Sequence, residues 1–226
     1  KAIDNINIEV EKGEIFGLLG LNGAGKTTTQ RMVSTVFQPS EGNITVNGFN
    51  SKSDSSEVRR NIGFLPTEVG LYDRLTAREV IKYFGILNDL DEQEIDRRIE
   101  KLFEKLALTE YTNKRCSKLS RGNKQKVAIA RAIIHEPPVF IFDEPTTGLH
   151  FHDINKLLNS FYALIEKGHS IICIEHNMDV IKCADWVIDL GPKGGDKGGK
   201  IVFEGTPEKL IKNKKSLTAK FLRKKL

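Results

Sequence analysis

The chain has 226 residues, of which 39% are hydrophobic and 29% charged, and its formal net charge is +5. This length and composition predict a globular protein with one large core. No apolar run approaches the ~20 residues of a membrane span, and no signal peptide opens the chain. Because Cys116, Cys173 and Cys183 have neither C-x-x-C spacing nor paired histidines, we expect reduced thiols in a cytoplasmic protein, without disulfides or a zinc site.

A phosphate-binding motif follows the first apolar stretch, residues 14–19, which predicts a buried strand. Residues 20–27 read G-x-x-x-x-G-K-T, and a helix is expected from Lys26 to about residue 37. Glycines let backbone N–H groups point at phosphate oxygens, Lys26 supplies a cation, and the Thr27 hydroxyl can ligate magnesium. The alternative is a glycine-rich turn with a chance lysine. The residues expected to contact nucleotide here are Gly20, Asn22, Gly23, Gly25, Lys26, Thr27 and Thr28.

The rest of the first half predicts an edge sheet and a helical insertion. Alternating Ile3, Ile6, Ile8 and Val10, together with residues 43–47, favour an antiparallel edge sheet. A strand is expected over residues 62–66, and residues 76–134 are rich in Glu, Lys, Leu and Ile at helical spacing. We therefore predict a single domain, with a core of residues 1–66 and 137–226 and a helical subdomain of residues 67–136.

A serine and a glycine, Ser120 and Gly122, open the last helical stretch of this insertion, which runs through Val127 and Ile129. The positive end of a helix and its free N–H groups can bind a phosphate, including one held by a neighbouring molecule. Taken alone, the pattern favours an ordinary N-capped helix.

Two adjacent carboxylates, Asp143 and Glu144, end a fully apolar stretch that begins at Val139. Parallel α/β sheets place ligands at the carboxyl ends of their strands, so Asp143 is a candidate metal ligand beside the phosphate loop. Glu144 could orient or deprotonate an attacking water, or could merely cap the strand end. His176 follows a further core strand, residues 170–175, and is a second candidate catalytic residue.

The C-terminal third alternates helices and strands, which favours a parallel sheet covered by helices. A glycine-rich hairpin over residues 191–199 precedes a last strand and two closing helices. The end of the chain carries no acid after residue 208, so it could face DNA or form a solvated amphipathic helix. We prefer the helix, with Leu217, Phe221 and Leu222 packed inward and the nucleic-acid signal weak. The basic residues are Lys212, Lys214, Lys215, Lys220, Arg223, Lys224 and Lys225.

Together, the P-loop, the Leu119-Ser120-Arg121-Gly122-Asn123 stretch and the Asp143-Glu144 pair resemble the motifs of ATP-binding-cassette (ABC) ATPases. The usual Leu-Ser-Gly-Gly-Gln signature has Arg121 and Asn123 at its third and fifth positions here. The resemblance implies an α/β P-loop fold with ATP and Mg²⁺ as ligands. It also implies a nucleotide-dependent homodimer, in which Ser120 and Gly122 meet the P-loop of the other copy, and a membrane subunit as partner. His176 then stands where the family's switch histidine contacts the γ-phosphate.

The resemblance divides along the chain. Residues 1 to about 149 are similar to exporter ATPase subunits of the NatA sodium-exporter type, in phrases such as residues 70–79. Residues from about 146 to 226 resemble the C-terminal part of the DNA-repair ATPase UvrA, in phrases such as residues 174–182, and His150 follows the UvrA pattern. Because residues 143–149 are shared by both, we interpret the chain as a chimera, joined artificially rather than naturally.

Two departures from the family pattern are present. The glutamine expected after the strand near Pro66 is replaced by Thr67 and Glu68. The chain opens at Lys1 without a methionine, so the family's first strand, with its adenine-stacking aromatic residue, is missing or lies outside this sequence.

Three classes of function follow. We expect an ABC nucleotide-binding domain that hydrolyses ATP with Mg²⁺, weakly or not at all if the chain is a chimera. The alternatives are a fragment of a UvrA-like DNA-repair ATPase and a fully functional exporter subunit. The third class is a non-catalytic chain that folds and at best binds nucleotide, whereas the exporter subunit is the active form of the first class.

Overall fold

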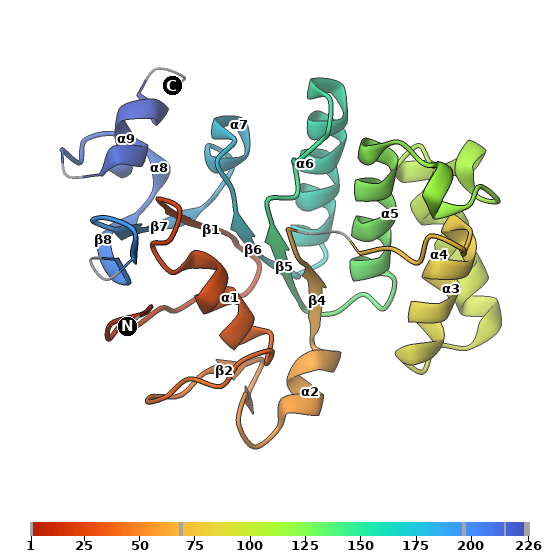
Figure 1. Cartoon of the computed structure of the whole chain (residues 1–226), viewed down its shortest axis with the longest axis horizontal. Helices are drawn as coiled ribbons and strands as arrows, with labels where there is room; N and C mark the ends of the chain where they lie inside the picture. Colours follow the sequence, from red (N-terminus) through yellow and green to blue (C-terminus); the bar gives the residue numbers. More distant parts are fainter. Residues whose placement is uncertain (1, 68–69, 196–197, 215, 224–226) are drawn as a thin grey trace.

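A six-stranded sheet in the order β4-β5-β6-β1-β7-β8 forms the centre of the computed structural model, which describes residues 2–67, 70–195, 198–214 and 216–223 (Figure 1). The first five strands in this order pair in parallel, and β8 runs antiparallel to β7. The predicted α/β architecture is therefore confirmed, with one antiparallel edge strand. The strands are β1 Ile15–Gly20, β4 Ile62–Leu65, β5 Val139–Asp143, β6 Ser170–Ile174, β7 Trp186–Gly191 and β8 Lys200–Gly205.

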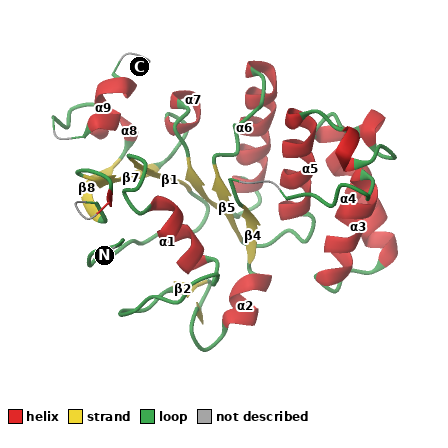
Figure 2. Ribbon diagram, in the orientation of Figure 1, coloured by secondary structure: helices red, strands yellow, loops and turns green. Residues whose placement is uncertain are grey.

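Helices cover the sheet (Figure 2). Its strands carry apolar residues toward both faces. Along β1, Ile15 and Leu19 belong to one hydrophobic cluster, whereas Phe16 and Leu18 belong to another. This alternation is the period of an extended strand buried on both faces, as parallel sheets require. The helices are α1 Lys26–Val33, α2 Ser55–Arg60, α3 Ala77–Leu87, α4 Glu92–Lys105, α5 Arg121–Ile133, α6 Phe151–Ile165, α7 Met178–Ile181, α8 Pro207–Leu210 and α9 Leu217–Leu222, with short 3₁₀ turns at Thr109–Tyr111 and Cys116–Lys118.

The predicted helical stretch contains α3, α4 and α5, which gather at one end of the molecule (Figure 1). A capping box of Thr76 and Glu79 starts α3, and the Asp91 side chain caps α4. A Cβ at Gly85 would crowd the Ile95 side chain, so this glycine allows α3 and α4 to approach closely. The division into a core and a helical subdomain stays a prediction.

The expected edge sheet takes a different form. Residues 2–14 lie in no strand, and the small antiparallel sheet is a local hairpin of β2 (Thr45–Val46) and β3 (Phe49–Asn50). Its turn residues, Asn47 and Gly48, both have positive φ, at 48° and 86°. An Asn-Gly turn of this kind matches the twist of a two-residue hairpin, so the nearest segment in sequence supplied the partner strand.

The C-terminal helix α9 also differs from the prediction. Ala219 and Leu222 are buried, whereas Leu217 and Phe221 are 49% and 59% exposed. The Ser216 hydroxyl accepts from the Ala219 amide and donates to Asp189 on β7, and this docking turns Ala219 and Leu222 toward the core. The predicted basic residues Lys215, Lys224 and Lys225 lie outside the described residues, as does Glu68.

Within the described ranges, no helix combines the length and apolar character needed to cross a lipid bilayer.

Candidate functional site

The phosphate loop joins β1 to α1, as the motif predicts. Gly20, Gly23 and Gly25 have φ values of 138°, 78° and 106°, a region that favours glycine because other residues are strained there. Among the described residues, no side chain caps the first turn of α1, so its N–H groups can donate to an anion. The Lys26 ammonium donates to the carbonyl oxygens of Gly20 and Leu21 at 2.8 and 3.1 Å, which holds its side chain along the loop.

A second glycine-rich segment supports this loop, and the sequence alone did not reveal that role. The Gly195 amide donates to the Gly23 carbonyl at 3.1 Å, and the Gly199 amide donates to the Ala24 carbonyl at 3.0 Å. A Cβ at Gly194 would overlap the carbonyl oxygen of Asn22. The segment after β7 therefore packs backbone to backbone against the phosphate loop.

Asp143 ends β5 and is only 3% exposed. Burial raises the pKa of its carboxyl group and nearby Glu144 raises it further, whereas a hydrogen bond from Thr67 and the charge of Lys26 lower it. The Thr67 hydroxyl lies 2.5 Å from Asp143 Oδ2. Burial likewise lowers the pKa of Lys26, against the opposing effect of Glu144, Asp143 and Asp189. The predicted metal ligand and the predicted phosphate-binding lysine thus lie within electrostatic reach of one another.

Glu144 follows in a left-handed backbone conformation, with φ of 50°. Non-glycine residues in this conformation are strained and cluster at functional sites. Two backbone hydrogen bonds hold the conformation: the Glu144 amide donates to the Ile174 carbonyl at 2.8 Å, and the Thr147 amide donates to the Glu144 carbonyl at 3.0 Å. Glu144 Oε1 lies 3.8 Å from His176 Nε2. The structure therefore brings together the two predicted catalytic side chains from the ends of adjacent strands.

Ser120 and Gly122 begin α5 as predicted. The Ser120 hydroxyl accepts from the Asn123 amide at 3.2 Å, which is the N-cap of the ordinary interpretation. A Cβ at Gly122 would lie 3.2 Å from the Gly148 carbonyl oxygen, so α5 packs closely on the loop after β5. In the part of the chain that the structure describes, none of their hydrogen bonds reaches the phosphate loop of the same copy.

The donor set suits magnesium. Mg²⁺ prefers oxygen ligands and is typically bound by one or two carboxylates together with substrate phosphates. Asp143 supplies a buried carboxylate at a strand end, and Thr27 supplies an exposed hydroxyl in the first turn of α1. A cation near Asp143 would favour its ionised form, which burial disfavours.

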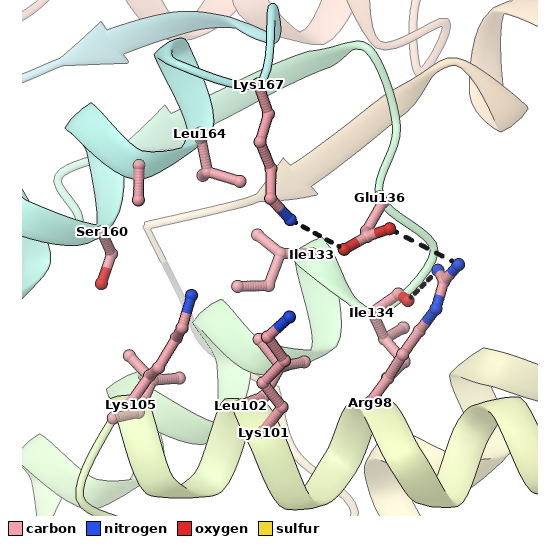
Figure 3. A pocket seen from close by; sticks show the side chains of 12 residues that line it. Arg98, Lys101, Leu102, Lys105, Ile133, Ile134, Glu136, Ser160, Leu164 and Lys167 are labelled. Atoms are coloured by element: carbon pink, nitrogen blue, oxygen red, sulfur yellow. Dashed lines mark hydrogen bonds and ion pairs between the residues drawn. The ribbon is translucent and has the colours of Figure 1, made fainter.

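A separate pocket lies between α4, the end of α5 and the end of α6 (Figure 3). Glu136 lies 3.5 Å from Arg98 and 3.4 Å from Lys167, and Leu102 and Leu164 line the same hollow. Glu136 precedes the first residue of β5, whereas Asp143 is its last residue. The pocket therefore lies at the opposite end of this strand from Asp143. It is thus distinct from the phosphate-loop site.

Comparison with known proteins agrees with this fold and site. The model of the ABC transporter family matches residues 3–147. The ATP-binding protein NatA of an ABC transporter from Bacillus subtilis is 40% identical over 218 residues, which cover 96% of this chain and 86% of NatA. The uncharacterized ABC transporter ATP-binding protein MJ1023 of Methanocaldococcus jannaschii is 37% identical over 94% of this chain and 74% of its own length. The chain belongs to the ABC transporter family of ATP-binding proteins.

Solved structures show the same architecture. The ATP-binding subunit of an ABC transporter has a TM-score of 0.84 at 28% identity, covering 93% of this chain and 86% of that one. The ATP-binding cassette MJ0796, in a dimeric post-hydrolysis state with ADP and phosphate, has a TM-score of 0.81 at 27% identity. The match covers 91% of this chain and 90% of that one.

The UvrA resemblance is real but partial. UvrA of Agrobacterium fabrum is 50% identical over 111 residues, which are 48% of this chain and only 11% of UvrA. Because the similarity to NatA continues across nearly the whole chain, the comparisons do not support a division between two parents.

Proposed function

We propose that this chain is the ATP-hydrolysing subunit of an ABC exporter and works in the cytoplasm. The observation that carries the proposal is the joint placement of Asp143 and Glu144 at the end of β5, with Lys26 within electrostatic reach and His176 at 3.8 Å from Glu144. The similarity to NatA over 96% of the chain supports the exporter class.

In this proposal the phosphate loop binds the triphosphate. The uncapped first turn of α1 and the loop amides donate to phosphate oxygens, and Lys26 neutralises charge at the outer phosphates. The remaining contacts are assigned to Gly20, Asn22, Gly23, Gly25, Thr27 and Thr28. Lowering of the Lys26 pKa by burial reflects a partly dry site, in which a charge-assisted hydrogen bond is strong.

Glu144 is assigned the role of base. Its carboxylate would accept a proton from, or orient, the water that attacks the terminal phosphorus, while the leaving ADP oxygen takes up the charge. His176, whose Nε2 lies 3.8 Å from Glu144 Oε1, would donate a hydrogen bond to the same phosphoryl group. Thr27 and Asp143 would hold Mg²⁺, which when bound would supply positive charge to stabilise the phosphate groups.

The active form in this proposal is a pair of chains. The dimeric structures of MJ0796 support it. Ser120 and Gly122 would then complete the partner's phosphate site from the N-terminus of α5, with the loop at His150 crossing between the copies. A membrane subunit as partner is part of the same proposal, since NatA is named as part of a transporter.

Magnesium-dependent ATPase measurements on matched variants test this function. Glu144→Gln keeps shape and should bind ATP while hydrolysis falls by ~10²–10⁴-fold, and it should accumulate an ATP-bound dimer visible by light scattering. Lys26→Ala should lose nucleotide binding in calorimetry, whereas the exposed helical Lys101→Ala should retain it. Unchanged turnover in Glu144→Gln contradicts the assignment of the base, and unchanged affinity in Lys26→Ala contradicts that of the loop.

The two-parent interpretation of the sequence is the second candidate, and the observation behind it is the 50% identity to UvrA over 111 residues. Contacts inherited from different parents would fit poorly across a dimer, because catalysis is sensitive to shifts of about 1 Å. It predicts a nucleotide-free monomer with weak turnover, and stimulation by DNA would favour the repair branch. Sedimentation that shows a stable nucleotide-free dimer, or turnover near ~10 s⁻¹, an ordinary enzyme rate, would contradict the two-parent interpretation. If added DNA also has no effect, the result favours the exporter subunit.

A further inference from the structure

Glu175 is a buried acid, 4% exposed, directly after β6. Buried carboxylates are rare unless they are paired or fully hydrogen-bonded. Glu175 accepts four hydrogen bonds from backbone amides and a hydroxyl group. Its partners belong to two different loops, so its role extends beyond its own turn.

The two carboxylate oxygens divide these bonds between the loops. Oε1 accepts from the amide and the hydroxyl of Thr146, at 2.8 and 2.6 Å. Oε2 accepts from the amides of His176 and Asn177, at 2.9 and 3.0 Å. An ionised carboxylate only accepts hydrogen bonds, at both oxygens, and a carboxamide cannot reproduce this pattern. Glu175 thus joins the loop after β5 to the loop after β6.

These loops carry the residues assigned to hydrolysis. Glu144 lies two positions before Thr146, and His176 is itself one of the bonded residues. The ladder between β5 and β6 ends at Asp143 and Ile174, and the hydrogen bond from the Glu144 amide to the Ile174 carbonyl continues it. Beyond that point, the hydrogen bonds accepted by Glu175 connect the loop after β5 to the loop after β6.

We propose that Glu175 is a positioning residue that holds Glu144 and His176 in register. This inference rests on the proposed function. Glu175 acts through the loop backbones, so it sets the rate of hydrolysis and leaves nucleotide affinity to the phosphate loop. A displacement of about 1 Å at either loop is enough to cost on the order of 10²-fold in rate.

The Glu175→Gln variant tests the inference, because it preserves volume and replaces one acceptor oxygen with an amide donor facing N–H groups. The maximal turnover should fall at least ~10-fold while the Kd for ATP, measured by calorimetry, stays within about two-fold. Glu166→Gln makes the same chemical change at an exposed glutamate and should match the parent chain. Turnover of Glu175→Gln within two-fold of the parent overturns the inference.

A double-mutant cycle with Glu144→Gln separates positioning from a general structural role. If Glu175 acts through Glu144, its loss adds little once Glu144→Gln is present, because residues that act as a unit are non-additive. Independent, multiplicative losses overturn the inference.

Amide hydrogen exchange decides the loop coupling without reference to turnover. In the nucleotide-free chain, Glu175→Gln should raise exchange in both segments, residues 144–148 and 175–178, whereas Glu166→Gln should change neither. Unaltered exchange in both segments overturns the inference. A parent chain that shows this coupling but no hydrolysis would instead contradict the proposed function.

Discussion

The Thr67 hydroxyl donates a hydrogen bond to Oδ2 of Asp143, with 2.5 Å between the two oxygens. Thr67 stands just after β4, where ABC ATPases usually have glutamine, and Asp143 ends the neighbouring strand β5. The side chain that departs from the family pattern is therefore in contact with the proposed metal ligand.

Thr67→Val should weaken the response to magnesium. It removes the hydrogen bond that orients Asp143 and lowers its pKa, and loss of such outer contacts typically costs ~10–100-fold in metal affinity. The magnesium concentration for half-maximal ATP-induced stabilisation, followed by thermal shift, should rise accordingly. Thr67→Ser keeps the hydroxyl and serves as control. An equal magnesium requirement in both variants would argue against this role.

Asp143→Asn should stabilise the chain without nucleotide at neutral pH. The folded-state pKa of Asp143 is raised above the ordinary value of 3.8. Its stabilising contribution is therefore full below that value and is lost as the pH rises through the folded pKa. The melting temperature of the variant in chelator should exceed that of the parent at pH 7.5, by roughly 2–4 °C for each kcal/mol. The gain should shrink toward pH 4, and a gain independent of pH would contradict the assignment.

Glu144→Gly should be more stable than Glu144→Ala, although both remove the proposed base. At φ of 50° a Cβ is strained, so glycine should gain ~1 kcal/mol over alanine. Glu104 is exposed within α4 and provides the opposite control. There the alanine variant should be more stable to unfolding than the glycine variant by ~1 kcal/mol. Denaturant unfolding of the four variants checks the reversal of sign. The same order at both sites would mean that the Glu144 backbone is not strained.

Gly194→Ala should weaken nucleotide binding from outside the phosphate-loop motif. Its Cβ would overlap the Asn22 carbonyl oxygen, and such overpacking typically costs ~1–3 kcal/mol. If the phosphate loop yields, ATP affinity in calorimetry should fall about 10-fold. Gly70→Ala has open space around its Cβ and should leave affinity unchanged. Equal affinities would show that the loop after β7 absorbs the change.

The sequence by itself predicted the features that depend on local spacing. The phosphate loop, the carboxylate pair at the end of β5 and His176 after β6 were predicted because parallel strands bring the residues at their carboxyl ends together. The Asn47–Gly48 hairpin had an equally local signal, but the apolar alternation of residues 3–10 pointed to a different partner.

Only the tertiary structure decided which loops meet. Glu175 accepts hydrogen bonds from Thr146 because β5 and β6 are adjacent and in register, although 26 residues separate the end of β5 from the start of β6. Thr67 reaches Asp143, and Gly194 reaches Asn22, for the same reason. Strand order and register are set by long-range packing on both faces of the sheet. A polar residue at the end of a strand carries no sequence pattern that would reveal this packing. The motifs therefore identified the chemistry, and the packing decided which residues hold it in place.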